Sequence, residues 1–118
     1  MVIVDATVRS AGETCAAMFK EDGRGYLIGE APTAGMSSQK SDVALPSGLF
    51  TLRVSTASNM SRVDGGKGIE GRGVAPHEIV PYVAADLAAG VDTAIRRAEA
   101  LLAAYPYDRV PYAPPKPR

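Results

Sequence analysis

The sequence is short of several residue types, and each shortage excludes a class of protein. A single cysteine among 118 residues excludes an internal disulfide and a cysteine-based metal cluster. The formal net charge is zero and both signs are interspersed, so we expect no binding to nucleic acid. No apolar run approaches the roughly 18 residues of a membrane span. We therefore expect no membrane span, no metal and no cofactor.

The length fits one small domain with a modest core. We expect residues 1–104 to form this domain, and residues 105–118, which are rich in proline, to form an extended tail. The amino terminus lacks a basic segment followed by an apolar core, so no signal peptide is predicted. The compartment of the protein stays open.

The first stretch of the chain predicts a buried strand followed by a helix. Residues 2–4 are β-branched and apolar, which favours a strand. Ser10 then opens a helical pattern with an apolar face, formed by Ala11, Cys15, Met18 and Phe19. We expect this face to be buried, with Cys15 as a small core residue.

The remaining pattern predicts an α/β fold built from short elements. A second strand is expected at 26–28, and a β-hairpin at 43–45 and 49–55 with a half-buried second arm. Residues 36–42 are expected to cross the surface as a loop. The last predicted helix runs from 93 to 104 with Asp92 as its N-cap. Its expected apolar stripe consists of Ile95, Ala98, Leu101 and Leu102.

Ser10 has two interpretations from the residues alone. Ser10 and Glu13 have the spacing of a capping box, in which the serine caps the helix and the glutamate reciprocates. A serine between a strand and a helix can also present its hydroxyl to a cleft. The first N–H groups of the helix would then lie beside a developing oxyanion.

Short motifs follow one another along the chain in a characteristic order. They are Val4-Asp5, Ser-Ala-Gly-Glu at 10–13, Gly23-Arg24, Gly29-Glu30, Pro-Thr-Ala-Gly at 32–35, Leu45-Pro46, Gly48, Gly65, Ile-Glu-Gly-Arg-Gly-Val at 69–74, Pro76, Asp86-Leu87, Gly90 and Asp92. In this order the chain resembles the carboxy-terminal half of the C-terminal processing, or tail-specific, serine peptidases.

The resemblance implies a partial ClpP/crotonase-like domain that hydrolyses peptide bonds in a polypeptide substrate. It assigns Ser10 as the nucleophile and the N–H of Ala11 as half of an oxyanion hole. Many members activate the serine with a lysine just after the Thr-x-Gly loop, where this chain has Met36. A thioether cannot accept the proton. Lys40 is close in sequence and is a weak substitute for that base.

A second branch of these peptidases, which includes tricorn-like and retinoid-binding-protein-like members, uses a Ser-His-Glu arrangement. The resemblance to this branch places the glutamate at Glu70. The histidine would come from an upstream half, which we expect to be missing, or from a partner chain. The chain's own His77 is expected to be a solvated loop residue rather than a base.

Two functions remain open from the sequence. The first is a serine peptidase fragment that forms an acyl-enzyme at Ser10 and is inactive by itself. The alternative is a truncated, catalytically inactive relative that acts as a binding or structural module. A homo-oligomer is possible in either case.

Overall fold

The structure is a computed structural model, and it describes residues 1–59 and 66–105. Its centre is a parallel three-stranded sheet with the strand order β1-β2-β5. The strands are β1 (Val2–Val4), β2 (Leu27–Gly29) and β5 (Glu78–Ile79). Parallel strands expose both faces to neighbouring elements, and each face must be covered.

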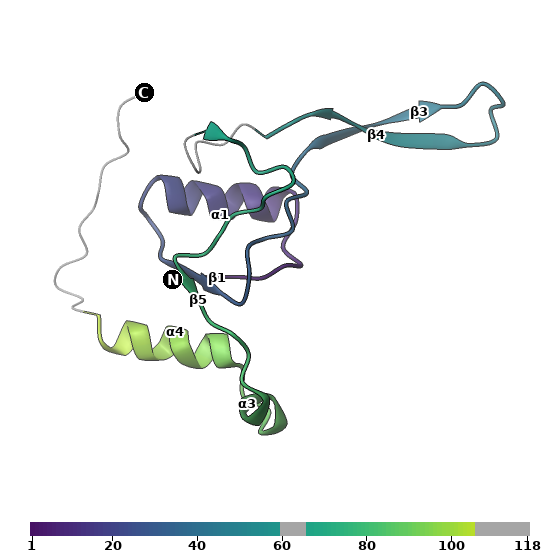
Figure 1. Cartoon of the computed structure of the whole chain (residues 1–118). Coiled ribbons are helices and arrows are strands. Elements are labelled where there is room, and N and C mark those ends of the chain that lie inside the picture. Colours follow the sequence, from purple (N-terminus) through teal and green to yellow (C-terminus); the bar gives the residue numbers. More distant parts are fainter. Residues whose placement is uncertain (60–65, 106–118) are drawn as a thin grey trace.

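The two longer helices lie on opposite sides of this sheet (Figure 1), α1 (Ala11–Glu21) on one side and α4 (Thr93–Ala103) on the other. Successive residues of β2 point to opposite faces, and both are fully buried. Leu27 packs in a cluster with Val4, Ala16, Ala17, Ile69 and Val74. Ile28 packs in a second cluster with Val80, Ala98 and Leu101. The expected α/β class is confirmed.

The strand β1 lies at the edge of the sheet. Its register pairs Val2 with Leu27 and Val4 with Gly29, and its other edge has no strand among residues 1–59 and 66–105. The same edge position leaves Ile3, on the α4 side, 43% exposed. The open edge leaves backbone N–H and carbonyl groups of the first strand unpaired among the described residues.

The predicted hairpin is formed by β3 (Gln39–Ala44) and β4 (Thr51–Ala57). Figure 1 shows it projecting away from the sheet and helices. The prediction of a half-buried second arm is wrong, because all of β4 is exposed except the half-buried Val54. Residues 39–42 are strand and not the loop that their polarity predicted, because pairing with β4 satisfies their backbone.

The predicted orientation of α1 is also wrong. Its larger apolar residues face outward, and Cys15 is exposed rather than buried. The buried face consists of Glu13, Ala16 and Ala17. Small alanines let the helix backbone approach the sheet closely, which a face with methionine and phenylalanine would prevent.

The last part of the described chain contains a short helix, α3 (Ala84–Ala88), that the sequence pattern did not predict. The N-cap of α4 is confirmed, since Asp92 Oδ1 accepts from the N–H groups of Ala94 (2.8 Å) and Ile95 (3.0 Å). Two of the four residues of the predicted apolar stripe of α4 are buried or partly buried as expected. Ala98 and Leu101 face the sheet, whereas Ile95 and Leu102 are largely exposed.

Residues 106–118 of the predicted tail lie outside the described residues. Across the described part of the chain, none of the helices has the length and apolar character that a membrane crossing requires.

Candidate active site

Ser10 stands at the junction of β1 and α1 in an unusual backbone conformation. Its φ is 53° and its ψ is −120°, and among the described residues it alone combines a side chain with a positive φ. Such a conformation costs about 1–3 kcal/mol, and residues held in it cluster at functional sites. Ser10 is exposed, so its hydroxyl is accessible at the amino-terminal end of α1.

The same junction carries the predicted capping box of Ser10 and Glu13. The Ser10 N–H donates to Glu13 Oε2 (3.2 Å) and to the Met36 carbonyl (3.1 Å). The N–H of Ala11 is among the first of the helix and has no intrahelical acceptor.

Glu13 is the most heavily engaged side chain of the site. It is fully buried, and its Oε1 accepts from Thr33 Oγ1 and from the Gly35 N–H, each at 2.6 Å. Its Oε2 accepts from the Met36 N–H (2.8 Å) and from Ser10. One carboxylate thus links Ser10 to the loop at 33–36, which comes from a distant part of the chain.

That loop lies backbone to backbone against residues 71–74. Thr33 and Val74 exchange two hydrogen bonds, from the Thr33 N–H to the Val74 carbonyl (3.2 Å) and from the Val74 N–H to Thr33 Oγ1 (2.7 Å). A Cβ at Gly73 would lie 2.0 Å from the Thr33 carbonyl oxygen, and one at Gly35 would lie 2.8 Å from the Arg72 nitrogen. The glycines are required because no side chain fits between these segments.

Glu70 lies just before this glycine-rich segment and contacts the other end of the 33–38 region. Its Oε2 accepts from the Ser37 N–H (2.8 Å), and its Oε1 accepts from Ser38 Oγ (3.1 Å). Loss of solvent acts to raise the pKa of Glu70, but these hydrogen bonds and the nearby Lys40 ammonium outweigh it and lower the pKa. Glu70 is exposed and stays ionised at neutral pH.

Ser10 and Glu70 contact consecutive residues of one segment. Ser10 donates to the carbonyl of Met36, and Glu70 accepts from the N–H of Ser37. No direct hydrogen bond joins Ser10 to Glu70 in the part of the chain that the structure describes. The backbone of Ser10 and the carboxylate of Glu70 thus both contact the segment 36–37.

A sequence model of peptidase family S41 matches residues 1–80 of the chain. The chain belongs to peptidase family S41. The matched region runs from β1 to the end of β5 and contains Ser10, Ala11 and Glu70. The resemblance drawn from the sequence is thereby confirmed at the level of the family. No curated protein matches the chain significantly.

Several residues of this candidate site carried no signal in the sequence. Asn59 Nδ2 donates to Thr14 Oγ1 (2.8 Å) and to Ser37 Oγ (3.1 Å), which links α1, the loop after Met36 and the end of β4. These polar residues look like ordinary surface residues in the sequence. Glu13 did carry a signal, but the capping box explains only one of its four hydrogen bonds.

The lysine considered as a substitute base is engaged elsewhere. Lys40 Nζ donates to Ser38 Oγ (2.6 Å) and to the Ser38 carbonyl (3.3 Å). Ser38 Oγ in turn lies 2.9 Å from Ser55 Oγ and contacts Glu70. Lys40 therefore fixes the root of the hairpin and the carboxylate of Glu70. Met36 supplies its backbone N–H and carbonyl to the site, not its thioether.

His77 lies at the opposite end of the parallel sheet from Ser10, because it precedes β5 whereas Ser10 follows β1. It is exposed, as expected, but its ring is engaged. Its Nδ1 accepts from the Leu27 N–H (2.9 Å), and the ring stacks on Tyr26 at 5.0 Å. Partial burial and the charge of Lys20 lower the pKa of His77, so the neutral ring that this hydrogen bond requires is favoured.

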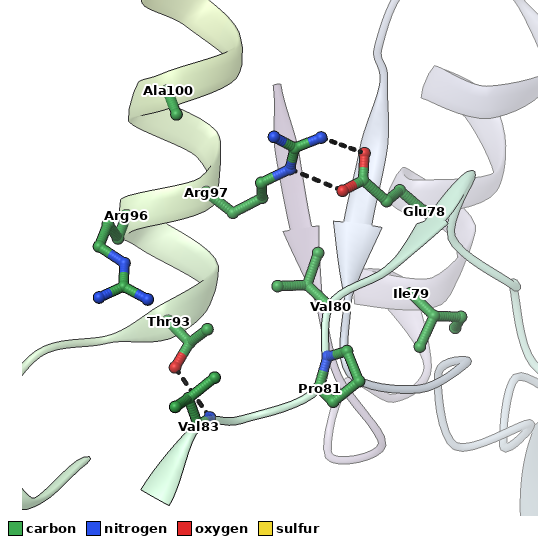
Figure 2. Close-up of a pocket in the computed structure, with 9 residues that line it drawn as sticks. All are labelled: Glu78, Ile79, Val80, Pro81, Val83, Thr93, Arg96, Arg97 and Ala100. Atoms are coloured by element: carbon green, nitrogen blue, oxygen red, sulfur yellow. Dashed lines mark hydrogen bonds and ion pairs between the residues drawn. The ribbon is translucent and has the colours of Figure 1, made fainter. Parts of the chain in front are cut away.

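A cavity that Ser10 does not line lies between β5 and α4 (Figure 2). It holds about 530 Å³ and is lined by Glu78, Ile79, Val80, Pro81, Val83, Thr93, Arg96, Arg97 and Ala100. Arg97 forms a two-pronged ion pair with Glu78, with Nε–Oε1 at 2.7 Å and Nη2–Oε2 at 3.3 Å. No group of three or more potential metal ligands occurs among the residues that the structure describes.

Proposed function

We propose that this chain carries the nucleophile and the acidic residue of a serine peptidase site. Ser10 is the nucleophile, the Ala11 N–H donates to the oxyanion, and Glu70 orients a histidine that comes from outside these 118 residues. The fold class would be a partial ClpP/crotonase-like domain over residues 1–104. The arrangement follows the Ser-His-Glu branch of the family, because Met36 removes the lysine of the other branch.

The reaction would proceed through an acyl-enzyme. Ser10 Oγ attacks the carbonyl carbon of the scissile peptide bond while its proton passes to the imidazole. The negative charge that develops on the carbonyl oxygen accepts from the Ala11 N–H, aided by the positive end of α1. Collapse of the intermediate breaks the C–N bond, and the leaving amine takes the proton from the imidazolium. Water then hydrolyses the acyl-enzyme by the same route.

Glu70 suits the role of the orienting carboxylate for an electrostatic reason. Its lowered pKa keeps it ionised, and an ionised carboxylate stabilises the imidazolium that forms during attack. The hydrogen bonds from Ser37 and Ser38 hold the carboxylate in one orientation. A carboxylate has about four acceptor positions, so these contacts leave capacity for an imidazole N–H.

The observation that carries the proposal is the strained, exposed conformation of Ser10 at the start of α1. A capping serine ordinarily has an extended backbone, whereas Ser10 has a positive φ and is exposed at the start of α1. Hydrogen bonds hold this strain in place: the Ser10 N–H donates to Glu13 and to Met36, and the Ser10 carbonyl accepts from N–H groups in the first turn of α1.

Imidazole added to the solution tests the proposal on the chain as it exists. The chain alone should react negligibly with a fluorophosphonate probe, because serine is a weak nucleophile without a base. Imidazole can occupy the position of the absent histidine side chain, and we expect it to increase labelling of Ser10 at least about tenfold. Mass spectrometry of the labelled peptide identifies the modified residue.

Matched variants assign the roles. Ser10→Ala should abolish the labelling, Glu70→Gln should reduce only the imidazole-dependent part, and Ser47→Ala in the hairpin turn should leave it unchanged. The weakly basic isostere pyrazole should not replace imidazole. Labelling that is unaffected by imidazole, or that occurs at another serine, would refute the assignment. Robust labelling without any added base would mean that the base lies within the chain itself.

A second candidate function is a non-catalytic binding module of the S41 family. The observation that favours it is that His77 and Lys40 are both engaged elsewhere, by Leu27 and by Ser38 respectively. A failure of imidazole to activate Ser10 in a chain that is shown to be folded would support this function over the first.

A further inference from the structure

The hairpin is a two-stranded ribbon with two chemically different faces. The register pairs Val43 with Leu52, and the Leu45 N–H donates to the Phe50 carbonyl (2.9 Å), so these four side chains share one face. The opposite face carries Asp42 and Arg53, which are also paired in the register. We call the first set, Val43, Leu45, Phe50 and Leu52, the apolar face of the ribbon.

The apolar face is open to solvent. The side chains are exposed by 49% at Val43, 40% at Leu45, 68% at Phe50 and 52% at Leu52. Leu49 at the tip is 80% exposed. The ribbon projects beyond the sheet and helices (Figure 1), so the body of the chain does not cover it. A contiguous apolar patch of this kind marks an interaction surface.

On the opposite face of the ribbon, the charged side chains of Asp42 and Arg53 pair with each other. Arg53 Nε donates to Asp42 Oδ1 (2.8 Å), and Arg53 Nη2 donates to Asp42 Oδ2 (3.2 Å). This cross-strand pair stabilises the ribbon's register, and the two charges neutralise each other. An isolated two-stranded hairpin is only marginally stable in water, so a ribbon of this length needs packing on its apolar face.

We propose that the apolar face of the ribbon packs against the same face of a second copy of this chain. The face bears no charge, so a symmetric pair creates no repulsion and leaves no buried charge without a partner. The ribbon projects from the sheet and helices (Figure 1), which leaves its apolar face accessible to a second copy. Stacked strand pairs of this kind lie about 10 Å apart.

The exposed area is sufficient for a weak dimer. The four side chains of the apolar face expose on the order of 400 Å² per copy, and hence about 800 Å² in a symmetric pair. An interface of this size is small, so the association should be weak and depend strongly on concentration. We expect dimers to form between about 1 and 100 µM, which corresponds to micromolar dissociation constants.

Sedimentation velocity of the complete chain tests the proposal, in reducing buffer because Cys15 is exposed. The wild type should shift from monomer to dimer over that concentration range. Leu52→Lys places a charge in the centre of the apolar face and should weaken the association by about 100-fold or more. Thr51→Lys adds the same charge to the opposite face of the same strand, next in sequence, and should leave the dimer intact.

Each alternative outcome overturns the proposal. A wild type that stays monomeric at 100 µM would show that the ribbon's partner is not a second copy, and an added polypeptide that binds it would then identify a different occupant. A dimer that survives both Leu52→Lys and Phe50→Lys would place the interface elsewhere, for example on the exposed side of α1. Circular dichroism confirms that each variant is folded, so that a loss of association is not a loss of structure.

Discussion

Replacing Glu13 gives the sharpest test of how the site is held together. The carboxylate is fully buried and accepts from Thr33 Oγ1, from the Gly35 and Met36 N–H groups, and from Ser10. Glu13→Ala leaves these donors without an acceptor and creates a cavity. An unsatisfied buried donor costs about 1–3 kcal/mol, so we expect a loss of roughly 3–6 kcal/mol in the free energy of unfolding.

Glu13→Gln removes the charge and one acceptor oxygen of the side chain while it keeps the side-chain volume. The amide keeps the shape of the side chain, but one of its two ends becomes an NH₂ group that faces N–H or O–H donors. We expect a loss of about 2–4 kcal/mol. Since a domain of this size is stable by about 5–15 kcal/mol, even this isosteric change removes a large fraction of the stability.

Urea unfolding followed by circular dichroism measures both effects. Glu99→Gln is the matched control, because Glu99 is an exposed carboxylate within a helix and its loss should change the free energy by less than about 0.5 kcal/mol. Amide chemical shifts of Gly35 and Met36 should move in Glu13→Gln, since both N–H groups lose a charged acceptor. A stability of Glu13→Gln within about 0.5 kcal/mol of wild type would refute the reasoning.

Three further predictions follow from the backbone and from the histidine. Gly73→Ala should lower the free energy of unfolding in urea by at least about 2 kcal/mol more than Gly90→Ala does. Both glycines have a positive φ, but of the two only Gly73 would bring its new Cβ against backbone, 2.0 Å from the Thr33 carbonyl oxygen. Ser10→Gly should be about 1 kcal/mol more stable than Ser10→Ala, because glycine relieves the positive φ; equal stabilities would argue against strain at Ser10. Stability should fall as the pH falls below about 6.5, because His77 has a lowered pKa in the folded chain and the unfolded chain binds the proton first. His77→Phe should flatten that slope between pH 7 and pH 5, and an unchanged slope would contradict the role given to the ring.

The local features of this chain could be predicted because their causes are local. A β-branched run forms β1, Asp92 caps α4 through its own carboxylate, and alternation with a central turn forms the hairpin. The order of short motifs was enough to indicate the family, and with it Ser10 as the candidate nucleophile.

The orientation of the elements could not be read from the sequence, because it depends on the neighbour that each element meets. In α1 the large apolar residues suggested the buried face, but the sheet selects Ala16 and Ala17, which allow a close approach. The exposed face of Cys15 and Met18 is therefore a consequence of tertiary packing.

The candidate site shows the same division between local and tertiary causes. The sequence by itself determined that a serine starts α1 and that a glutamate stands three residues later. Only the tertiary structure decided what they do, because the loop at 33–36 brings three donors to Glu13 and the Met36 carbonyl to the Ser10 N–H. These contacts hold Ser10 at a φ of 53°, which its own residue type disfavours. Strain of this kind is invisible to local propensity, since it exists only where distant segments of the chain enforce it.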